Sequence, residues 1–189
     1  MLLLASSSPR RSELMKLAGY EFEVVPANVS ETFLHGTPPM QIVEQLSPRK
    51  AQAVAKQHPE DIVLAADTVV VLKGRILGKP KDAEMAKAML KLLSGNVHQV
   101  YTGYTVISGK KLLCGHECTS VEFYSLSEEE IDAYVATEEP MDKAGAYGIQ
   151  GKGGLFVKRI NGDFYNIVGL PIAKIRRILN GLQNTAEES

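Results

Sequence analysis

The stretch LLLASSSPRR, residues 2–11, joins a short apolar segment directly to the start of a helix. Residues 2–5 have the apolar character of a short buried strand. Ser8 is a favoured N-cap residue, and Pro9 is of the type favoured at the first helical position. We therefore predict a strand-to-helix turn here, with the helix continuing through Leu17 and ending at Gly19.

Two arginines fall in the first turn of this predicted helix. The helix dipole disfavours a cation there by about 0.3–1 kcal/mol each, so on that ground alone removal of Arg11 would stabilise the free protein slightly. The same turn offers unpaired backbone N–H groups and serine hydroxyls, which together suit a phosphate. Ser6, Ser8, Arg10 and Arg11 are therefore candidate phosphate ligands. The alternative is an ordinary capped helix with two solvated arginines.

The composition is that of an ordinary globular protein and excludes several other classes. The chain has 189 residues, of which 44% are hydrophobic and 23% are charged, enough for one domain with a substantial core. The net charge of −1 gives no general attraction for nucleic acid or for an anionic membrane. No apolar run has the length of a membrane span, and the N-terminus lacks a secretion signal. Two cysteines make no disulfide framework, so we expect a reduced, cytoplasmic protein.

Strand and helix signals interleave along the rest of the chain. We predict strands at 22–25, 62–72, 75–77, 97–107 and 112–124, and helices at 39–58, 82–95, 127–137 and 171–181, with a hairpin from 155 to 168 that turns at Asn161-Gly162. Ser47-Pro48 is expected to interrupt the second helix and restart it. The fold class is then α/β, a mixed central sheet flanked by helices, with two lobes around a cleft. We expect one domain over residues 1–182 and a polar tail over 183–189.

Asp67 stands in the middle of the apolar strand IVLAADTVVVL. A carboxylate among buried strand residues is costly unless it is paired, bound to a metal or placed at a strand end. Asp67 is therefore a candidate general base or metal ligand, and Glu31, on a predicted loop, is a candidate partner. The alternative is a turn that splits two strands at Asp67.

Three further polar residues lie in settings that suit a nucleotide. Lys50 would occupy the first turn of the helix restarted at Ser47-Pro48. Pro80 forces Lys79 into an extended conformation, so that its ammonium group has a defined direction, although a solvated surface lysine is an equal alternative. Gln150 lies in DKAGAYGIQG, residues 142–151, where glycines allow close approach to a ligand and the amide suits a nucleobase edge.

Cys114, His116 and Cys118 alternate along a predicted strand. Their spacing is unlike that of the usual zinc motifs, and we do not assign them a metal.

The motifs occur in the order seen in Maf proteins, and the chain resembles that family to about Leu182. The shared motifs are Leu4-Ala5-Ser6-Ser7-Ser8-Pro9-Arg10-Arg11, Lys50-Ala51, Ala66-Asp67-Thr68, Gly78-Lys79-Pro80, Ser94-Gly95 with His98, Thr102-Gly103, and residues 142–151. The form Gly148-Ile149-Gln150-Gly151 resembles the members that act on dTTP and UTP. One departure from the usual pattern is Ser47-Pro48, just before Lys50.

The resemblance implies a Maf/inosine-triphosphatase-like α/β fold and a cytoplasmic enzyme, often a dimer. The implied reaction splits a nucleoside triphosphate into monophosphate and pyrophosphate with a divalent cation, Mg²⁺ or Mn²⁺. In this sequence Asp67 matches the position of the general base, and we expect Lys79 to be catalytic as well. Ser6, Arg11, Lys50 and Lys79 match phosphate-site positions, to which we add Ser8. Arg10, Thr68 and Gln150 match positions tied to base choice, and Glu31, with Asp67, matches the metal site.

A second class of function stays open at this point. Maf-like proteins are also associated with septum formation and arrest of cell division, so the chain could be a nucleotide-binding regulator with secondary hydrolysis. CTP and modified pyrimidine nucleotides also remain candidate substrates.

Overall fold

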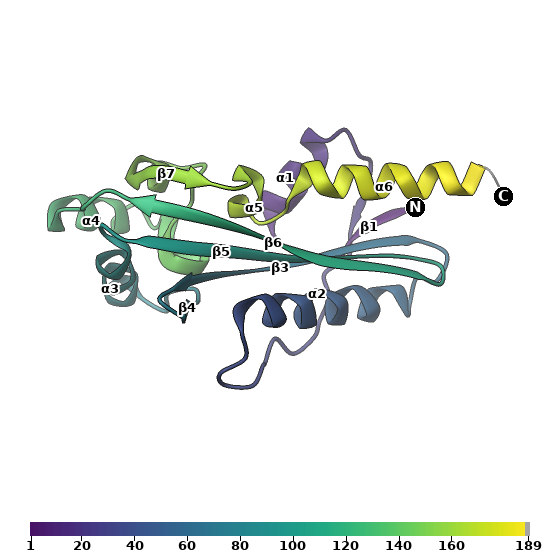
Figure 1. Ribbon diagram of the computed structural model, residues 1–189, viewed down its shortest axis with the longest axis horizontal. Coiled ribbons are helices and arrows are strands. Elements are labelled where there is room, and N and C mark those ends of the chain that lie inside the picture. Colours follow the sequence, from purple (N-terminus) through teal and green to yellow (C-terminus); the bar gives the residue numbers. More distant parts are fainter. Residues whose placement is uncertain (188–189) are drawn as a thin grey trace. The chain divides into compact units, whose positions relative to one another are not determined.

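The computed structural model describes residues 1–187, and the side chains of residues 1–182 (Figure 1). Its helices and strands alternate along the chain. The order is β1 Leu2–Leu4, α1 Pro9–Leu17, β2 Glu23–Val24, α2 Pro39–Ala55, β3 Ile62–Leu72, β4 Arg75–Leu77, α3 Ala83–Leu93, β5 Val97–Ser108, β6 Lys111–Phe123, α4 Glu128–Val135, the 3₁₀ turns η1 Glu139–Asp142, η2 Ala144–Ala146 and η3 Lys152–Phe156, β7 Val157–Asn161, α5 Phe164–Val168 and α6 Ile172–Glu187.

The strands form one mixed sheet in the order β2-β1-β3-β5-β6-β7, with β4 paired to β3. β1 runs parallel to both β2 and β3, whereas the pairs β3–β4 and β6–β7 are antiparallel. Helical crossovers give the parallel pairs and tight turns give the antiparallel ones. The predicted fold class, a mixed α/β sheet flanked by helices, is confirmed.

The chain divides into two compact units, and the divisions fall inside β3, β5 and β6 and directly after α5. Unit 1 holds residues 1–67, 102–117 and the chain from 169 onward, and unit 2 holds residues 68–101 and 118–168. In unit 1, α2 covers one face of the strands, whereas α1 and α6 cover the other face (Figure 1). Apolar residues of β1, α2, β3 and β5 form the core beneath α2: Leu3, Ala5, Ala51, Val54, Val63, Ala65 and Ile107.

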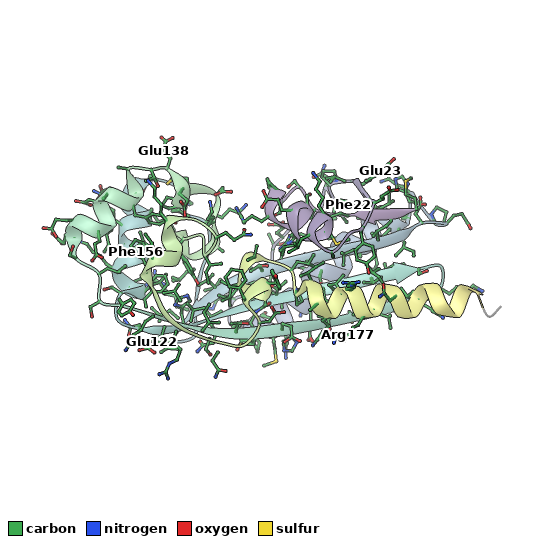
Figure 2. The ribbon with its side chains drawn as sticks, turned by 90° about the horizontal axis from the view of Figure 1, so that it is seen from above. Phe22, Glu23, Glu122, Glu138, Phe156 and Arg177 are labelled. Atoms are coloured by element: carbon green, nitrogen blue, oxygen red, sulfur yellow. The ribbon has the colours of Figure 1, made fainter. Side chains whose placement is uncertain are left out.

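Unit 2 has its own core, built around aromatic rings. Phe123 lies edge-on to Tyr147 and to Phe156, and Phe156 is labelled in Figure 2. Two of the helices that cover this core begin with a side-chain cap: Asp82 Oδ1 accepts a hydrogen bond from the Met85 N–H, and Ser127 forms a capping box with Glu130. These two caps satisfy helix N–H groups locally, which is why the sequence could predict both helix starts.

The predicted break in α2 at Ser47-Pro48 is wrong. The helix is continuous from Pro39 to Ala55 with Pro48 inside it. Ser47 does not cap a new helix, because its hydroxyl is fully buried and lies 3.0 Å from Thr105 Oγ1 of β5. Packing against β5 therefore outweighs the backbone hydrogen bond that Pro48 removes. Lys50 consequently lies inside a helix and not in a first turn.

Two predictions near the C-terminus are also wrong. Residues Phe164–Val168 form the short helix α5, and β7 pairs with β6 instead. The cause is Asn166, whose buried side chain donates hydrogen bonds to the Val100 carbonyl and to Thr119 Oγ1. The last helix continues past Gly181 to Glu187, into the predicted polar tail, whose last two residues lie outside the described part.

Among residues 1–187, no helix has both the length and the apolar character needed to cross a membrane.

Candidate active site

Lys50 connects two carboxylates in unit 1. Its Nζ lies 2.5 Å from Asp67 Oδ1 and 2.7 Å from Glu31 Oε1. The side chains of Lys50 and Asp67 are 11% and 12% exposed, whereas that of Glu31 is 65% exposed. Asp67 and Glu31, which were predicted as partners, thus both contact one ammonium group, that of Lys50.

The local backbone explains why these groups meet. β3 continues through Asp67 without a break, so the alternative of a turn at this residue is excluded. Helix α2 packs so close to β5 that a Cβ on Gly103 of β5 would lie 2.3 Å from the carbonyl oxygen of Val43 of α2. Because only glycine fits there, the motif Thr102-Gly103 serves helix packing that brings Lys50 over the strands.

The loop that carries Glu31 is held by the residue next to Lys50. Arg49 Nη1 donates hydrogen bonds to the carbonyls of Ser30 and Thr32, at 2.7 and 3.1 Å. These two residues flank Glu31, so adjacent residues of α2 hold the loop backbone and the Glu31 carboxylate. Arg49 was not among the predicted site residues, because no local pattern identifies a side chain that binds distant carbonyls.

Arg11 is not the solvated arginine of the alternative prediction. It is 9% exposed, its Nε donates to the Gly169 carbonyl at 2.8 Å and its Nη1 donates to Ser6 Oγ at 3.0 Å. Burial lowers the pKa of the Arg11 guanidinium, whereas the negative charges of Asp67 and Glu31 raise it. The guanidinium links α1 to the turn before α6, so we now expect removal of Arg11 to destabilise the protein, contrary to the prediction from the helix dipole alone.

The other predicted phosphate ligands surround the start of α1. Ser6 is buried, and its Oγ also accepts a hydrogen bond from the Ser8 N–H at 3.3 Å. Ser8 occupies the N-cap position of α1, but its side chain makes no capping hydrogen bond, contrary to prediction. Arg10 is half-buried. The first turn of α1 thus has neither an acidic residue nor a side-chain cap to occupy its N–H groups.

Strand pairing relates this helix start to Asp67. β1 and β3 are parallel, with Leu4 level with Leu64, and the Ala5 N–H donates to the Leu64 carbonyl at 2.8 Å. β1 therefore ends level with Leu64, whereas β3 continues in the same direction to Leu72, so Asp67 lies three residues past the level at which β1 ends. Ligand sites of α/β proteins typically form beyond the carboxyl ends of parallel strands.

Thr68, Lys79 and Gln150 belong to unit 2 and are described within it. Thr68 follows Asp67 directly in β3 and is half-buried. Lys79 is exposed and follows β4, between an exposed Gly78 and a buried Pro80. The Gly78 carbonyl accepts a hydrogen bond from the Gly145 N–H at 3.1 Å. This bond ties the Lys79 segment to the glycine-rich segment that carries Gln150.

Gln150 is exposed, and the backbone around it is fastened to two side chains that the sequence analysis missed. Tyr134 Oη accepts a hydrogen bond from the Gly148 N–H, and the Glu139 carboxylate accepts hydrogen bonds from the N–H groups of Lys152 and Gly153. The glycines of this segment were expected to make room for a ligand. At Gly148, Gly151 and Gly153 they make room for protein side chains instead. The close spacing of these glycines was the signal in the sequence that another group lies against the backbone.

The Maf-like protein family matches residues 1–182 of the chain. The chain belongs to the Maf-like protein family. It is 54% identical over 187 residues to the dTTP/UTP pyrophosphatase of Bacillus cytotoxicus, which covers 99% of this chain and 98% of the relative. It is 53% identical over 178 residues to the dTTP/UTP pyrophosphatase of Bacillus mycoides, covering 94% and 93%. The resemblance to Maf proteins is thereby confirmed.

A solved structure shows the same fold at lower sequence similarity. The Ham1 protein of Staphylococcus aureus aligns with a TM-score of 0.54 and 19% identity, over 95% of this chain and 98% of that one. This similarity supports the Maf-like fold and says nothing of the substrate.

A divalent cation would depend on Asp67 and Glu31. Their oxygens contact the same ammonium nitrogen, so they converge closely enough to share one cation. Within the described residues, no group of three or more histidines, cysteines and acidic residues could hold a metal. Two carboxylates, with water and substrate phosphates as the other ligands, fit the preference of Mg²⁺. Of the residues considered for zinc, Cys114 and Cys118 are exposed and His116 Nδ1 lies 2.7 Å from Glu44 Oε1.

Proposed function

We propose that this chain hydrolyses dTTP and UTP to the nucleoside monophosphate and pyrophosphate. The observation that carries the proposal is the contact of Lys50 with both Asp67 and Glu31, where Asp67 lies three residues past the level at which β1 ends. A buried carboxylate, a second carboxylate and clustered cations are what cleavage of a triphosphate requires. The names of the Bacillus relatives support dTTP and UTP as the substrates.

Asp67 acts as the general base in this proposal. Its carboxylate accepts a proton from a water molecule as the oxygen of that water attacks the α-phosphorus. The bond from the α-phosphorus to the bridging oxygen breaks, and pyrophosphate leaves with the electron pair. Such a base contributes about 10²–10⁴-fold to the rate.

The cationic residues stabilise the charge that develops on the leaving pyrophosphate. Arg11, held by Gly169 and Ser6, places a fixed positive charge at the start of α1, where the helix N–H groups also favour anions. Lys50 orients Asp67 and Glu31, and Lys79 supplies a further ammonium group. Ser6 and Ser8 complete the phosphate contacts, and Arg10 acts with Gln150 and Thr68 on the choice of base.

Asp67 and Glu31 would hold the divalent cation, Mg²⁺ or Mn²⁺. When bound, that cation offsets triphosphate charge and lowers the pKa of bound water. Lys50 contacts the same carboxylate oxygens, so it holds the pair together before substrate arrives.

Gln150 and Thr68 select the base. The Gln150 amide can present its oxygen to N3–H and its NH₂ to O4 of thymine or uracil. A site built for these hydrogen bonds discriminates against bases that leave its polar groups unpaired.

The test is release of pyrophosphate and monophosphate from dTTP, UTP, CTP, ATP and GTP, with Mg²⁺ or Mn²⁺ and with EDTA as the control. We expect metal-dependent turnover that is fastest for dTTP and UTP. Tight nucleotide binding without turnover would contradict the proposal and support a nucleotide-binding regulator of septum formation.

A further inference from the structure

Residues 148–153, which we call the Gln150 loop, are fastened from inside by two side chains of unit 2. Tyr134 donates its hydroxyl hydrogen to Glu139 Oε1 at 2.9 Å and accepts the Gly148 N–H at 3.1 Å. Glu139 accepts the Lys152 N–H on Oε2 at 3.1 Å and the Gly153 N–H on Oε1 at 3.2 Å. The backbone is therefore held on both sides of Gln150.

The glycines of the loop show how tightly it closes around these side chains. A Cβ at Gly151 would lie 2.4 Å from Glu139 Oε1, and one at Gly153 would lie 2.6 Å from Tyr134 Oη. No other residue type fits either position without moving the carboxylate or the phenol. The arrangement of Glu139, Tyr134 and glycines thus specifies one loop conformation.

The charge of Glu139 suits this task. A carboxylate accepts hydrogen bonds on both oxygens, whereas an amide in its place turns an NH₂ donor toward one of the N–H groups. Burial raises the pKa of the Glu139 carboxyl, but the two backbone N–H groups and the Tyr134 hydroxyl outweigh burial and hold that pKa below its usual value. The loop is therefore fastened to an ionised group.

We propose that Glu139 is a positioning residue that sets pyrimidine selectivity by holding the backbone on both sides of Gln150. This inference rests on the proposed function, in which the Gln150 amide selects the base. Glu139 itself is a loop support and contacts no substrate. A fixed loop presents the amide without the entropic cost of ordering it at each binding event.

The variant Glu139→Gln tests the proposal, and Glu138→Gln is the matched control. Glu138 is the preceding residue, it is exposed, and its side chain points away from unit 2 in Figure 2. Both substitutions remove one negative charge. The measurements are kcat and KM for UTP and for CTP, inhibition by inorganic tripolyphosphate, which has no base, and the melting temperature.

We expect Glu139→Gln to raise KM for UTP by about tenfold. This factor corresponds to the free-energy cost of ordering the backbone of about one residue. The UTP-to-CTP ratio of kcat/KM should fall, whereas kcat and inhibition by tripolyphosphate stay within about twofold of the wild type. Glu138→Gln should change none of these values beyond that range. Tyr134→Phe, which removes the acceptor for the Gly148 N–H, should shift the ratio in the same direction and carries the test if Glu139→Gln does not fold.

The possible outcomes separate the two proposals. Equal losses for UTP, CTP and tripolyphosphate in a folded Glu139→Gln protein would overturn the positioning role alone, and so would an unchanged UTP-to-CTP ratio. Absence of nucleotide cleavage by the wild-type protein would overturn the proposed function and this inference with it.

Discussion

Lys50 Nζ lies 2.5 Å from Asp67 Oδ1, and this buried ion pair joins α2 to β3. Removal of one partner of a buried ion pair leaves the other charge buried and unpaired. The free energy lost in this way is larger than the stability that the intact pair contributes. Glu31 contacts the same ammonium group, so loss of Lys50 would place two carboxylates beside each other without a cation.

Lys50→Met should therefore lower the free energy of unfolding by about 3 kcal/mol in metal-free buffer. Added Mg²⁺ should recover part of this loss, because a cation bound by the folded state alone stabilises it. Urea unfolding with and without Mg²⁺ measures both effects. Lys56→Met, at an exposed position after α2, is the control and should change little. A Lys50→Met protein as stable as the wild type would contradict the importance of the pair.

Arg11→Ala should lower the free energy of unfolding by about 2–3 kcal/mol, because it leaves the buried Gly169 carbonyl and Ser6 hydroxyl without their charged donor. Arg10→Ala, at a half-buried position, should cost less than about 1 kcal/mol. Urea unfolding of the two variants gives the comparison. Equal stability losses would show that burial of Arg11 contributes nothing specific.

His98 should make the stability of the protein sensitive to acid. The ring is buried, its Nε2 lies 2.8 Å from Tyr147 Oη, and burial lowers the pKa of His98 from 6.5 to about 4. Between pH 6.5 and about pH 4, His98 is therefore protonated in the unfolded chain but neutral in the folded protein. The free energy of unfolding should have its full value above pH 6.5 and should fall by up to about 3 kcal/mol between pH 6.5 and pH 4.

Denaturant unfolding across that pH range tests the His98 prediction. His98→Gln should be less stable at pH 7, since it loses edge-on contacts with Phe123 and Tyr147, but its stability should depend less steeply on pH. The exposed His35 supplies the control, because His35→Gln should keep the wild-type slope. The same slope in His98→Gln would assign the acid sensitivity to other groups.

Gln150→Glu should lower kcat/KM for dTTP and UTP more than for CTP, because it replaces the amide donor that faces O4 with an acceptor. CTP presents an amino group at that position. The measured quantity is the UTP-to-CTP ratio of kcat/KM in the wild type and the variant. A constant ratio with both values reduced would mean that Gln150 serves the phosphates or the metal instead of the base.

Local signals were enough to predict most of the secondary structure. The strands predicted at 62–72 and 75–77 and the helix predicted at 82–95 are all present, as β3 Ile62–Leu72, β4 Arg75–Leu77 and α3 Ala83–Leu93. Such features depend on neighbouring residues, so the sequence displays them directly. The parallel pairing of β1 with β3 agrees with the predicted α/β class, since the helices α1 and α2 lie between the two strands in the chain.

The errors arose where a distant residue decides the local conformation. Ser47 has the character of a helix cap, yet its hydroxyl meets Thr105, and α2 passes through Pro48. Asn166 was predicted within a hairpin strand, yet it lies in α5, where its buried side chain donates hydrogen bonds to Val100 and Thr119. No window of neighbouring residues contains these partners.

The candidate site shows the same limit. Asp67 could be singled out by its residue type and setting, and Glu31 by the resemblance to Maf proteins. The ammonium group between them could not, because Lys50 reaches them through the packing of α2 on β5. Glu139 was missed altogether, although the glycine spacing around Gln150 indicated that something approaches the backbone closely.

The central claim is that Asp67 is the general base of triphosphate cleavage, and the most direct measurement is kcat for dTTP in Asp67→Asn. The substitution keeps the size of the side chain and an oxygen for Lys50, so the protein should fold, and kcat should fall by about 10²–10⁴-fold. Asp61→Asn, just before β3, is the control and should keep kcat within about twofold. A folded Asp67→Asn protein with near-wild-type kcat would contradict the account.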